Sequence, residues 1–131
     1  MDEQLRALLE APNIVHLATL LPDGSPHSVA IWAGLHEERV CFFTQPASRK
    51  ARNLREDARV AMSVVDRENP YRTAWLGGRV GETVEGEPAL TIIDRLSISY
   101  TGEPFPMRNG VVYLVDVERA GSMTLPFTPG D

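Results

Sequence analysis

The sequence of 131 residues is poor in several features, and each shortage excludes a class of protein or site. Cys41 is the only cysteine, so neither an intrachain disulfide nor a multi-thiolate metal site can form within the chain. No apolar run approaches the roughly 20 residues that a membrane-spanning helix needs. The first four residues include two acids and lack the basic start of a signal peptide, so we expect a soluble, cytoplasmic protein without a membrane partner.

Positive charge is also scarce, and it is concentrated in one segment. The formal net charge is −5, which argues against a dedicated nucleic-acid binder because such proteins need a basic field. The window 47–59 nevertheless holds five cations against two acids. The cations are Arg49, Lys50, Arg52, Arg55 and Arg59. A small acidic protein thus gathers five of its thirteen lysines and arginines in one short segment.

Length and hydrophobic pattern predict one mainly β domain over residues 1–131. Helices are expected over 2–10 and 46–57, and a third opens at Pro88 and closes at Gly102. Six strands are expected, joined mostly by short turns or helical insertions, over 13–21, 27–34, 39–44, 58–66, 71–85 and 110–119. The paired glycines at 77 and 78 indicate a bulge or a close backbone approach. Short turns make the strands antiparallel, so we predict a small six-stranded antiparallel barrel with helical insertions.

Side chains that could catalyse a reaction directly are hard to find. The three histidines share no metal-ligand spacing, and no HExxH or G-x-S-x-G motif is present. Cys41 lies in an apolar run, which predicts a buried, inert thiol. We therefore predict no catalytic side chain and no metal site, and we expect any reactive group to be a cofactor.

The segment 46–57 carries the strongest functional signal. Ser48 is a good N-cap candidate, which places cations in the first helical turn and Glu56 and Asp57 in the last. Both choices oppose the helix dipole, each by roughly 0.3–1 kcal/mol. An anion such as phosphate at the N-terminus would remove the first conflict. The alternative is an ordinary solvated, charged helix.

Two further regions are compatible with a bound ring. The strand 26–32 has small and polar residues that would let a flat ring approach the backbone, although it also reads as a plain barrel strand with His27 at its solvent end. Tyr100, Phe105 and Met107 could cap an apolar pocket. The aromatic residues that alternate over 71–75 are more typical of a core or an interface than of ring-stacking groups.

In these residues the chain resembles the pyridoxamine 5′-phosphate oxidase-like flavin and deazaflavin oxidoreductases. The resemblance covers nearly the whole chain and is most specific over 43–60. It rests on the order of the segments Ala18-Thr19-Leu20, Asp23-Gly24-Ser25-Pro26-His27, Cys41-Phe42-Phe43-Thr44, Ser48-Arg49-Lys50-Ala51-Arg52-Asn53-Leu54, Ala58-Arg59-Val60-Ala61, Gly78-Arg79-Val80 and Tyr100-Thr101-Gly102.

The resemblance implies a split β-barrel homodimer with two cofactor sites at the subunit interface. It implies that Thr44, Ser48, Arg49 and Lys50 anchor the cofactor phosphate. It also implies that the strand at His27, Ser28 and Val29 lies along the tricyclic ring, and that Tyr71 and Thr73 approach the cofactor.

One departure from the family pattern affects the choice of cofactor. True pyridoxamine-phosphate oxidases have an arginine in the second strand, whereas 27–32 has no arginine or lysine, and the sequence stops at Asp131 before their substrate-binding extension. The pattern looks more like the short members that use coenzyme F420, a deazaflavin with a phosphodiester and an acidic tail. Our leading hypothesis is therefore an F420-dependent reductase that passes hydride to a small conjugated acceptor such as an enone or quinone. The alternatives are an FMN-dependent reductase or oxidase, and a non-catalytic binder of a cofactor or tetrapyrrole.

Overall fold

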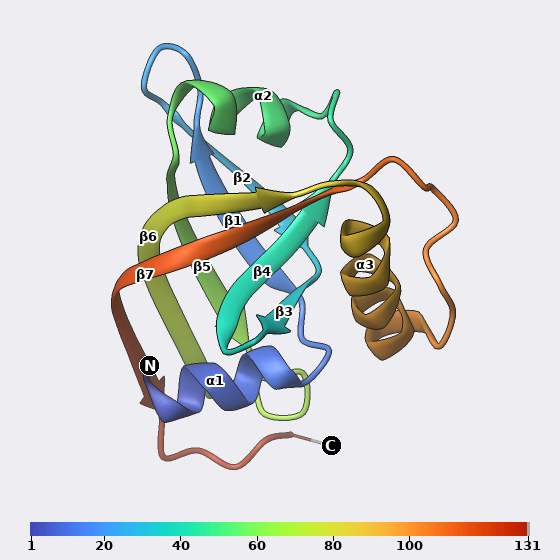
Figure 1. Cartoon of the computed structure of the whole chain (residues 1–131). Helices are drawn as coiled ribbons and strands as arrows, with labels where there is room; N and C mark the ends of the chain where they lie inside the picture. The colour runs from blue at the N-terminus through green and yellow to red at the C-terminus, as the bar shows by residue number, and fades with distance from the viewer. Residues whose placement is uncertain (131) are drawn as a thin grey trace.

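A computed structural model describes residues 1–130 and contains one antiparallel sheet of seven strands with three helices (Figure 1). The spatial order of the strands is β2-β1-β5-β6-β7-β4-β3. The strands are β1 (Val15–Leu20), β2 (Pro26–Ile31), β3 (Ala33–His36), β4 (Arg39–Thr44), β5 (Arg59–Val65), β6 (Arg72–Val84) and β7 (Val111–Thr124). The helices are α1 (Glu3–Glu10), α2 (Arg49–Glu56) and α3 (Gly86–Thr101).

The mainly β, antiparallel architecture is confirmed, but the strand count is seven rather than six. The strand expected over 27–34 is divided at Trp32, because its first half pairs with β1 and its second half with β4. β2 and β3 therefore form the two edges of the sheet and are joined by one residue, which curls the sheet into a half-barrel. The last strand is longer than expected, since its pairing with β6 continues to Thr124.

The inside of the half-barrel holds the larger of two hydrophobic clusters. Burial alternates along β1 and β5, as expected for strands with one face on the core. Val15, Leu17, Met62, Val64 and Leu76 supply much of this inner face. α1 closes one end of it by burying Leu5, Leu8 and Leu9. The opposite face of β1, β5 and β6 has mostly small or polar side chains and remains exposed.

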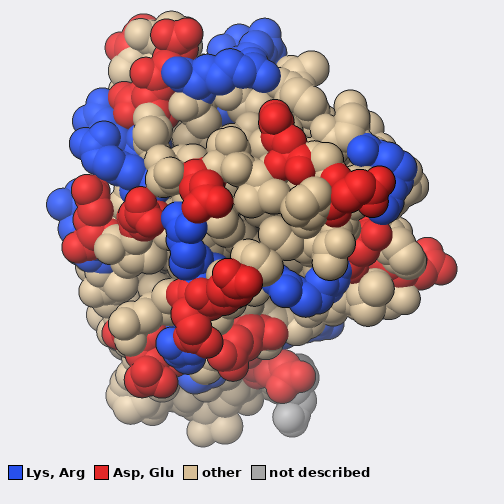
Figure 2. Space-filling model, viewed as in Figure 1, with Lys and Arg blue, Asp and Glu red and all other residues tan. Residues whose placement is uncertain are grey.

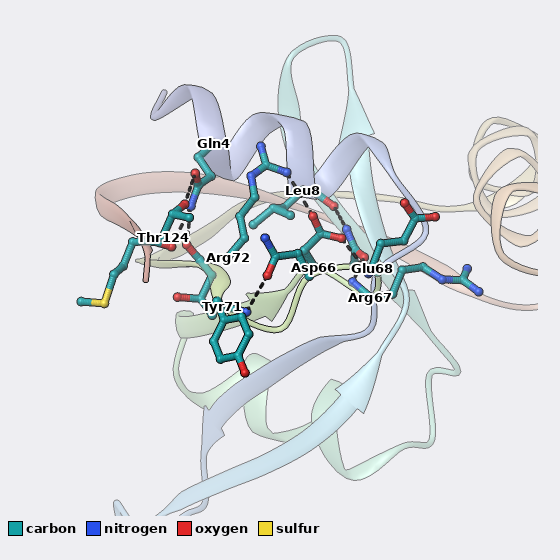
Figure 3. Close-up of polar contacts among 12 residues, drawn as sticks. Gln4, Leu8, Asp66, Arg67, Glu68, Tyr71, Arg72 and Thr124 are labelled. Atoms are coloured by element: carbon teal, nitrogen blue, oxygen red, sulfur yellow. Dashed lines mark hydrogen bonds and ion pairs between the residues drawn. The ribbon is translucent and has the colours of Figure 1, made fainter. Parts of the chain in front are cut away.

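Hydrogen bonds tie α1 to the ends of the strands beneath it, as Figure 3 shows. Gln4 donates its side-chain amide to the carbonyls of Thr73 (3.0 Å) and Met123 (2.9 Å). The buried Asn13 donates to the carbonyl of Leu8 and accepts from the backbone N–H of Arg67, both at 2.8 Å. These contacts fix the end of the sheet at which β6 begins.

The paired glycines lie in β6, where the register with β7 shifts between Gly77 and Gly78. A Cβ atom on Gly78 would lie 2.2 Å from the backbone oxygen of Asp116 in β7. The two features predicted for these glycines, a bulge and a close backbone approach, are thus both present.

α3 packs against the other side of β7 and β4 and forms the second cluster. In this cluster, Ile92, Ile93 and Leu96 of α3 pack together with Val112 and Leu114 of β7. The helix begins at Gly86, two residues before Pro88, and ends at Thr101. Its C-cap is Gly102, whose φ of 86° is the left-handed value that favours glycine. None of the helices among residues 1–130 combines the length and apolarity that crossing a bilayer requires.

Candidate functional site

α2 lies at the end of the half-barrel opposite α1 (Figure 1). It begins at Arg49, three residues later than the expected helix, and Ser48 is its N-cap as predicted. The Ser48 hydroxyl oxygen accepts a hydrogen bond from the N–H of Ala51 (3.1 Å), and its carbonyl accepts one from Arg52 (3.1 Å). The hydroxyl of Thr44, at the end of β4, lies 2.9 Å from the Ser48 hydroxyl. Two of the four predicted phosphate-binding residues therefore touch at the helix start.

The N-terminus of α2 is open. Within residues 1–130, the backbone N–H groups of Arg49 and Lys50 donate no hydrogen bond. Unpaired N–H groups at a helix start attract anions, and the helix dipole adds to this attraction. Thus the first turn presents two free donors and two cationic side chains at the same pole.

The cations of α2 also lack acidic partners. Across residues 1–130, the ion pairs involve His36 and arginines outside α2, such as Arg39, Arg59 and Arg108, and no carboxylate pairs with a cation of α2. In Figure 2, blue side chains lie beside red ones at the end of the molecule where α2 lies. An anion bound here would not have to displace an existing salt bridge.

The C-terminal end of α2 differs from the expectation. Asp57 is the C-cap, outside the helix, and its carboxylate binds Arg59 at 2.7 Å. The hydrogen bonds from Arg59 lower the pKa of Asp57 to about 2. Arg55 lies in the last turn, where a cation is favourable, and donates to the carbonyl of Pro46 (2.7 Å). The dipole conflict is therefore mainly at the N-terminus, with Glu56 as a smaller contribution at the other end.

Three pockets border α2, and two of them adjoin the residues at its start. The first, which we call the arginine pocket, measures about 550 Å³ and lies between α2 and the β1–β2 turn. Its lining from α2 and the residue after it consists of Arg49, Arg52, Asn53, Arg55, Glu56 and Asp57, and its lining from the end of β1 and the turn consists of Leu20, Leu21, Pro22 and Gly24. The second, the aromatic pocket, measures about 310 Å³, and Lys50 is the one charged residue in its lining. Arg49 and Lys50 thus line different pockets on the two sides of the helix start.

Aromatic side chains form the walls of the second pocket. Its lining consists of Ile14, Ala30, Ile31, Trp32, Phe43, Phe105 and Lys50. The ring of Trp32 stacks on Tyr100 with centroids 5.2 Å apart and meets Phe43 and Phe105 edge-on, at 6.4 and 6.0 Å. Tyr100 is fixed in turn, since its hydroxyl lies 2.9 Å from the carbonyl of Ala33. The pocket is therefore lined by apolar and aromatic side chains and by one cation.

The predicted ring-facing strand reaches this pocket through its second half. Ala30, Ile31 and Trp32 line the pocket, whereas His27, Ser28 and Val29 lie nearer the β1–β2 turn and do not. β2 is an edge strand, so its outer backbone donors and acceptors are not used by the sheet. A planar heterocycle in the pocket can bind these groups. The buried Nδ1 atom of His27 has no hydrogen-bond partner among residues 1–130.

Tyr71 and Thr73 lie elsewhere. The ring of Tyr71 contacts that of Phe127, with centroids 5.3 Å apart, and the carbonyl of Thr73 accepts from Gln4 (Figure 3). Neither residue lines a pocket beside α2. One chain alone therefore does not bring these two predicted contacts to the α2 site.

Sequence reasoning missed a buried polar support beneath α2. Asn53 is 1% exposed, and its amide donates to the hydroxyl of Thr19 on β1 (3.0 Å). Its carbonyl oxygen lies 3.4 Å from the guanidinium of Arg49. The signal in the sequence was a polar residue, Asn53, on the face of an amphipathic helix that also carries Ala51 and Leu54. A polar residue on such a face needs a hydrogen-bond partner in the core.

Other reactive groups are absent from the described chain. Cys41 is fully buried, and desolvation raises the pKa of its thiol to about 11, so it is not a nucleophile. Among residues 1–130, no three His, Cys, Asp or Glu side chains come together as a metal-binding group. The chemistry that this region can support depends on what binds beside α2.

Comparison with known proteins identifies the family. The model of the family described as pyridoxamine 5′-phosphate oxidase matches residues 1–118, and the chain belongs to this family. The pyridoxine/pyridoxamine 5′-phosphate oxidase of Rubrobacter xylanophilus is 34% identical over 84 residues, which cover 62% of this chain and 39% of that enzyme. The corresponding enzyme of Bacteroides thetaiotaomicron is 30% identical over 66 residues, or 50% and 31% of the two chains. These matches span well under half the length of both enzymes.

Solved structures resemble the chain over more of its length. An F420 reductase is 33% identical with a TM-score of 0.79, covering 88% of this chain and 94% of that one. A conserved hypothetical protein from Mycobacterium tuberculosis is 25% identical with a TM-score of 0.81, covering 100% and 92%. Both similarities agree with the curled, mainly β half-barrel of this family.

Proposed function

We propose that the protein is an oxidoreductase that binds an F420-type deazaflavin and transfers hydride from it to a small, flat, conjugated acceptor. The observation that carries the proposal is the open N-terminus of α2 directly beside an aromatic pocket. The first element suits a phosphate and the second suits a fused ring. The similarity to an F420 reductase along most of both chains supports the same assignment.

The residues present fit such a cofactor. The free N–H groups of Arg49 and Lys50 and the Lys50 ammonium would hold the phosphate, with the hydroxyls of Thr44 and Ser48 at the same helix start. The ring would lie against Ala30 and Trp32, along the edge of β2. When bound, the deazaflavin supplies two-electron hydride chemistry. Trp32, Phe43 and Phe105 exclude water from that space and orient the acceptor.

The arginine pocket favours F420 over FMN. It lies along the other side of α2, where Arg49, Arg52 and Arg55 form no ion pair with any of residues 1–130. These three arginines outnumber the two acids of its lining, Glu56 and Asp57, and Asp57 is already paired with Arg59. FMN ends at its phosphate and has no group for this pocket, whereas the acidic tail of F420 extends beyond the phosphodiester. The strand 27–32 also lacks the arginine of the true pyridoxamine-phosphate oxidases. FMN remains the alternative cofactor within the same site.

We further propose that the protein acts as a homodimer in the cytoplasm, with the cofactor at the interface. The outer sheet face carries a row of Ala30, His16, Ser63 and Trp75 on neighbouring strands. Trp75 and Val65 on this face are 47% and 41% exposed, which is unusual for large apolar side chains. A second copy seated there would cover them and close the open side of the aromatic pocket.

Ser63→Arg should convert this dimer to a monomer, because an arginine at the centre of the face leaves a buried, unpaired charge in the dimer. Sedimentation equilibrium would measure the mass. Thr91→Arg, on the exposed face of α3, adds the same charge elsewhere and should leave the dimer intact. A monomeric unmodified protein would contradict the proposal.

Titration of the purified protein with F420 and with FMN tests the cofactor assignment. We expect F420 to bind in the micromolar range or tighter, and its reduced form to reduce an enone or quinone. Micromolar binding of FMN alone, or a yellow protein on purification, would move the assignment to an FMN-dependent enzyme. Tight ligand binding with no turnover over many acceptors would instead indicate a non-catalytic carrier of cofactor or tetrapyrrole.

A further inference from the structure

Phe105 is held through both of its backbone polar groups by one ion pair. The carboxylate of Asp94 on α3 accepts from the N–H of Phe105 at 3.2 Å. The guanidinium of Arg108 donates to the carbonyl of Phe105 at 2.9 Å. Asp94 and Arg108 bind each other through two hydrogen bonds, of 2.8 and 3.0 Å. The Asp94 carboxylate, the Arg108 guanidinium and the N–H and carbonyl of Phe105 thus form a closed ring of hydrogen bonds.

The position of Phe105 depends on this ring more than the other aromatic walls do. Phe43 belongs to β4, and Trp32 joins two strands and stacks on Tyr100. Phe105 instead lies in the irregular segment 102–110, without sheet or helix hydrogen bonds of its own. Its ring meets Phe43 at 5.0 Å and Trp32 at 6.0 Å, both edge-on.

We propose that Asp94 and Arg108 are positioning residues that hold Phe105 against Trp32 and Phe43 and so fix the width of the aromatic pocket. A pocket of fixed width admits a flat fused ring more readily than a bulkier ligand. Its wall is also already ordered, so a ligand that fits does not have to order Phe105 as it binds. The identity of the ring, a deazaflavin, rests on the proposed function. The positioning role itself is a property of the chain without ligand.

An ordinary surface salt bridge would not act in this way. Asp94 and Arg108 have side-chain exposures of 27% and 48%, and exposed pairs contribute little to the stability of the whole fold. This pair differs from the others because both partners also bind the same backbone segment. Breaking it should therefore change the local position of Phe105 while the protein still folds.

The first test uses the protein without ligand. In a Trp75→Phe background, Trp32 is the only tryptophan, so its fluorescence reports on the pocket. Arg108→Ala and Asp94→Asn should each increase the quenching of Trp32 by acrylamide, and Arg108→Lys should give an intermediate value because it keeps the charge but not the two parallel bonds. Arg79→Ala is the matched control, since it breaks the exposed pair with Glu118, and neither of these residues lines the aromatic pocket.

The second test separates ring binding from phosphate binding. The probes are F420, its ring-and-ribityl fragment without phosphate or tail, and inorganic pyrophosphate. Arg108→Ala should weaken F420 and the fragment by the same factor, about three- to tenfold, as expected when one aromatic contact is no longer held. The affinity for pyrophosphate should not change.

Unchanged quenching in Arg108→Ala and Asp94→Asn would overturn the positioning role, and so would an equal increase in Arg79→Ala. If quenching rises as expected but no variant binds a deazaflavin, the positioning role stands and the proposed function fails. If quenching is unchanged while F420 binds the unmodified protein, the positioning role fails and the proposed function stands.

Discussion

Replacing Lys50 with alanine is expected to weaken cofactor binding by about 1–3 kcal/mol, or roughly 5- to 150-fold in the dissociation constant. Lys50 lies at the N-terminus of α2, lines the aromatic pocket and has no carboxylate partner among residues 1–130. The whole of its charge is therefore available to a bound phosphate. Isothermal titration with F420 would measure the loss.

Folding should respond in the opposite direction. Without ligand, a cation in the first turn of a helix opposes the dipole, so its removal should leave the free energy of unfolding unchanged or raise it slightly. Urea denaturation of the ligand-free protein would measure this.

Arg67→Ala is the matched control for Lys50→Ala, because it also removes one cation that has no acidic partner among residues 1–130, in the β5–β6 turn far from α2. It should leave cofactor affinity unchanged. Unchanged affinity in Lys50→Ala, or an equal loss in Arg67→Ala, would count against the phosphate site at α2.

Replacing Gly78 with alanine should have the largest effect on stability, a loss of about 1–3 kcal/mol or more. The added methyl group would lie 2.2 Å from the backbone oxygen of Asp116, and backbone in the centre of a sheet cannot move aside locally. The register shift between Gly77 and Gly78 would have to be redistributed along β6 and β7. Urea denaturation would give the change in midpoint.

The neighbouring glycine provides the control. In Gly77→Ala, the new Cβ would lie 3.2 Å from the Nε atom of Arg119, the end of an exposed and flexible side chain. This variant should lose less than about 1 kcal/mol, since surface side chains rearrange at low cost. Equal losses in the two variants would show that the close approach at Gly78 does not constrain the sheet.

Local signals in the sequence were sufficient for most of the fold. Alternating apolar residues, short turns and the N-cap at Ser48 depend on neighbours within a few positions, and they predicted the helices and the antiparallel strands. The division of 27–34 at Trp32 was not predictable in the same way. It depends on which distant strand pairs with each half, and nothing in those residues records that choice.

Only the part of the site that is contiguous in the sequence was predicted. The cations and caps of α2 are contiguous in the sequence, so their shared pole could be inferred. The aromatic pocket combines residues from β2, β4 and the segment after α3, which only the curled sheet brings together. Asn53 and Thr19 also meet only in the folded chain. Tyr71 and Thr73 stay predictions for an assembly of two chains.

A crystal structure of the protein with F420 tests the central claim most directly. We predict that the phosphodiester oxygens lie within hydrogen-bond distance of the Lys50 ammonium and of the N–H groups of Arg49 and Lys50, with the ring beside Trp32. A cofactor bound away from the start of α2, or an α2 pole that stays empty while the ring is bound, would contradict the account.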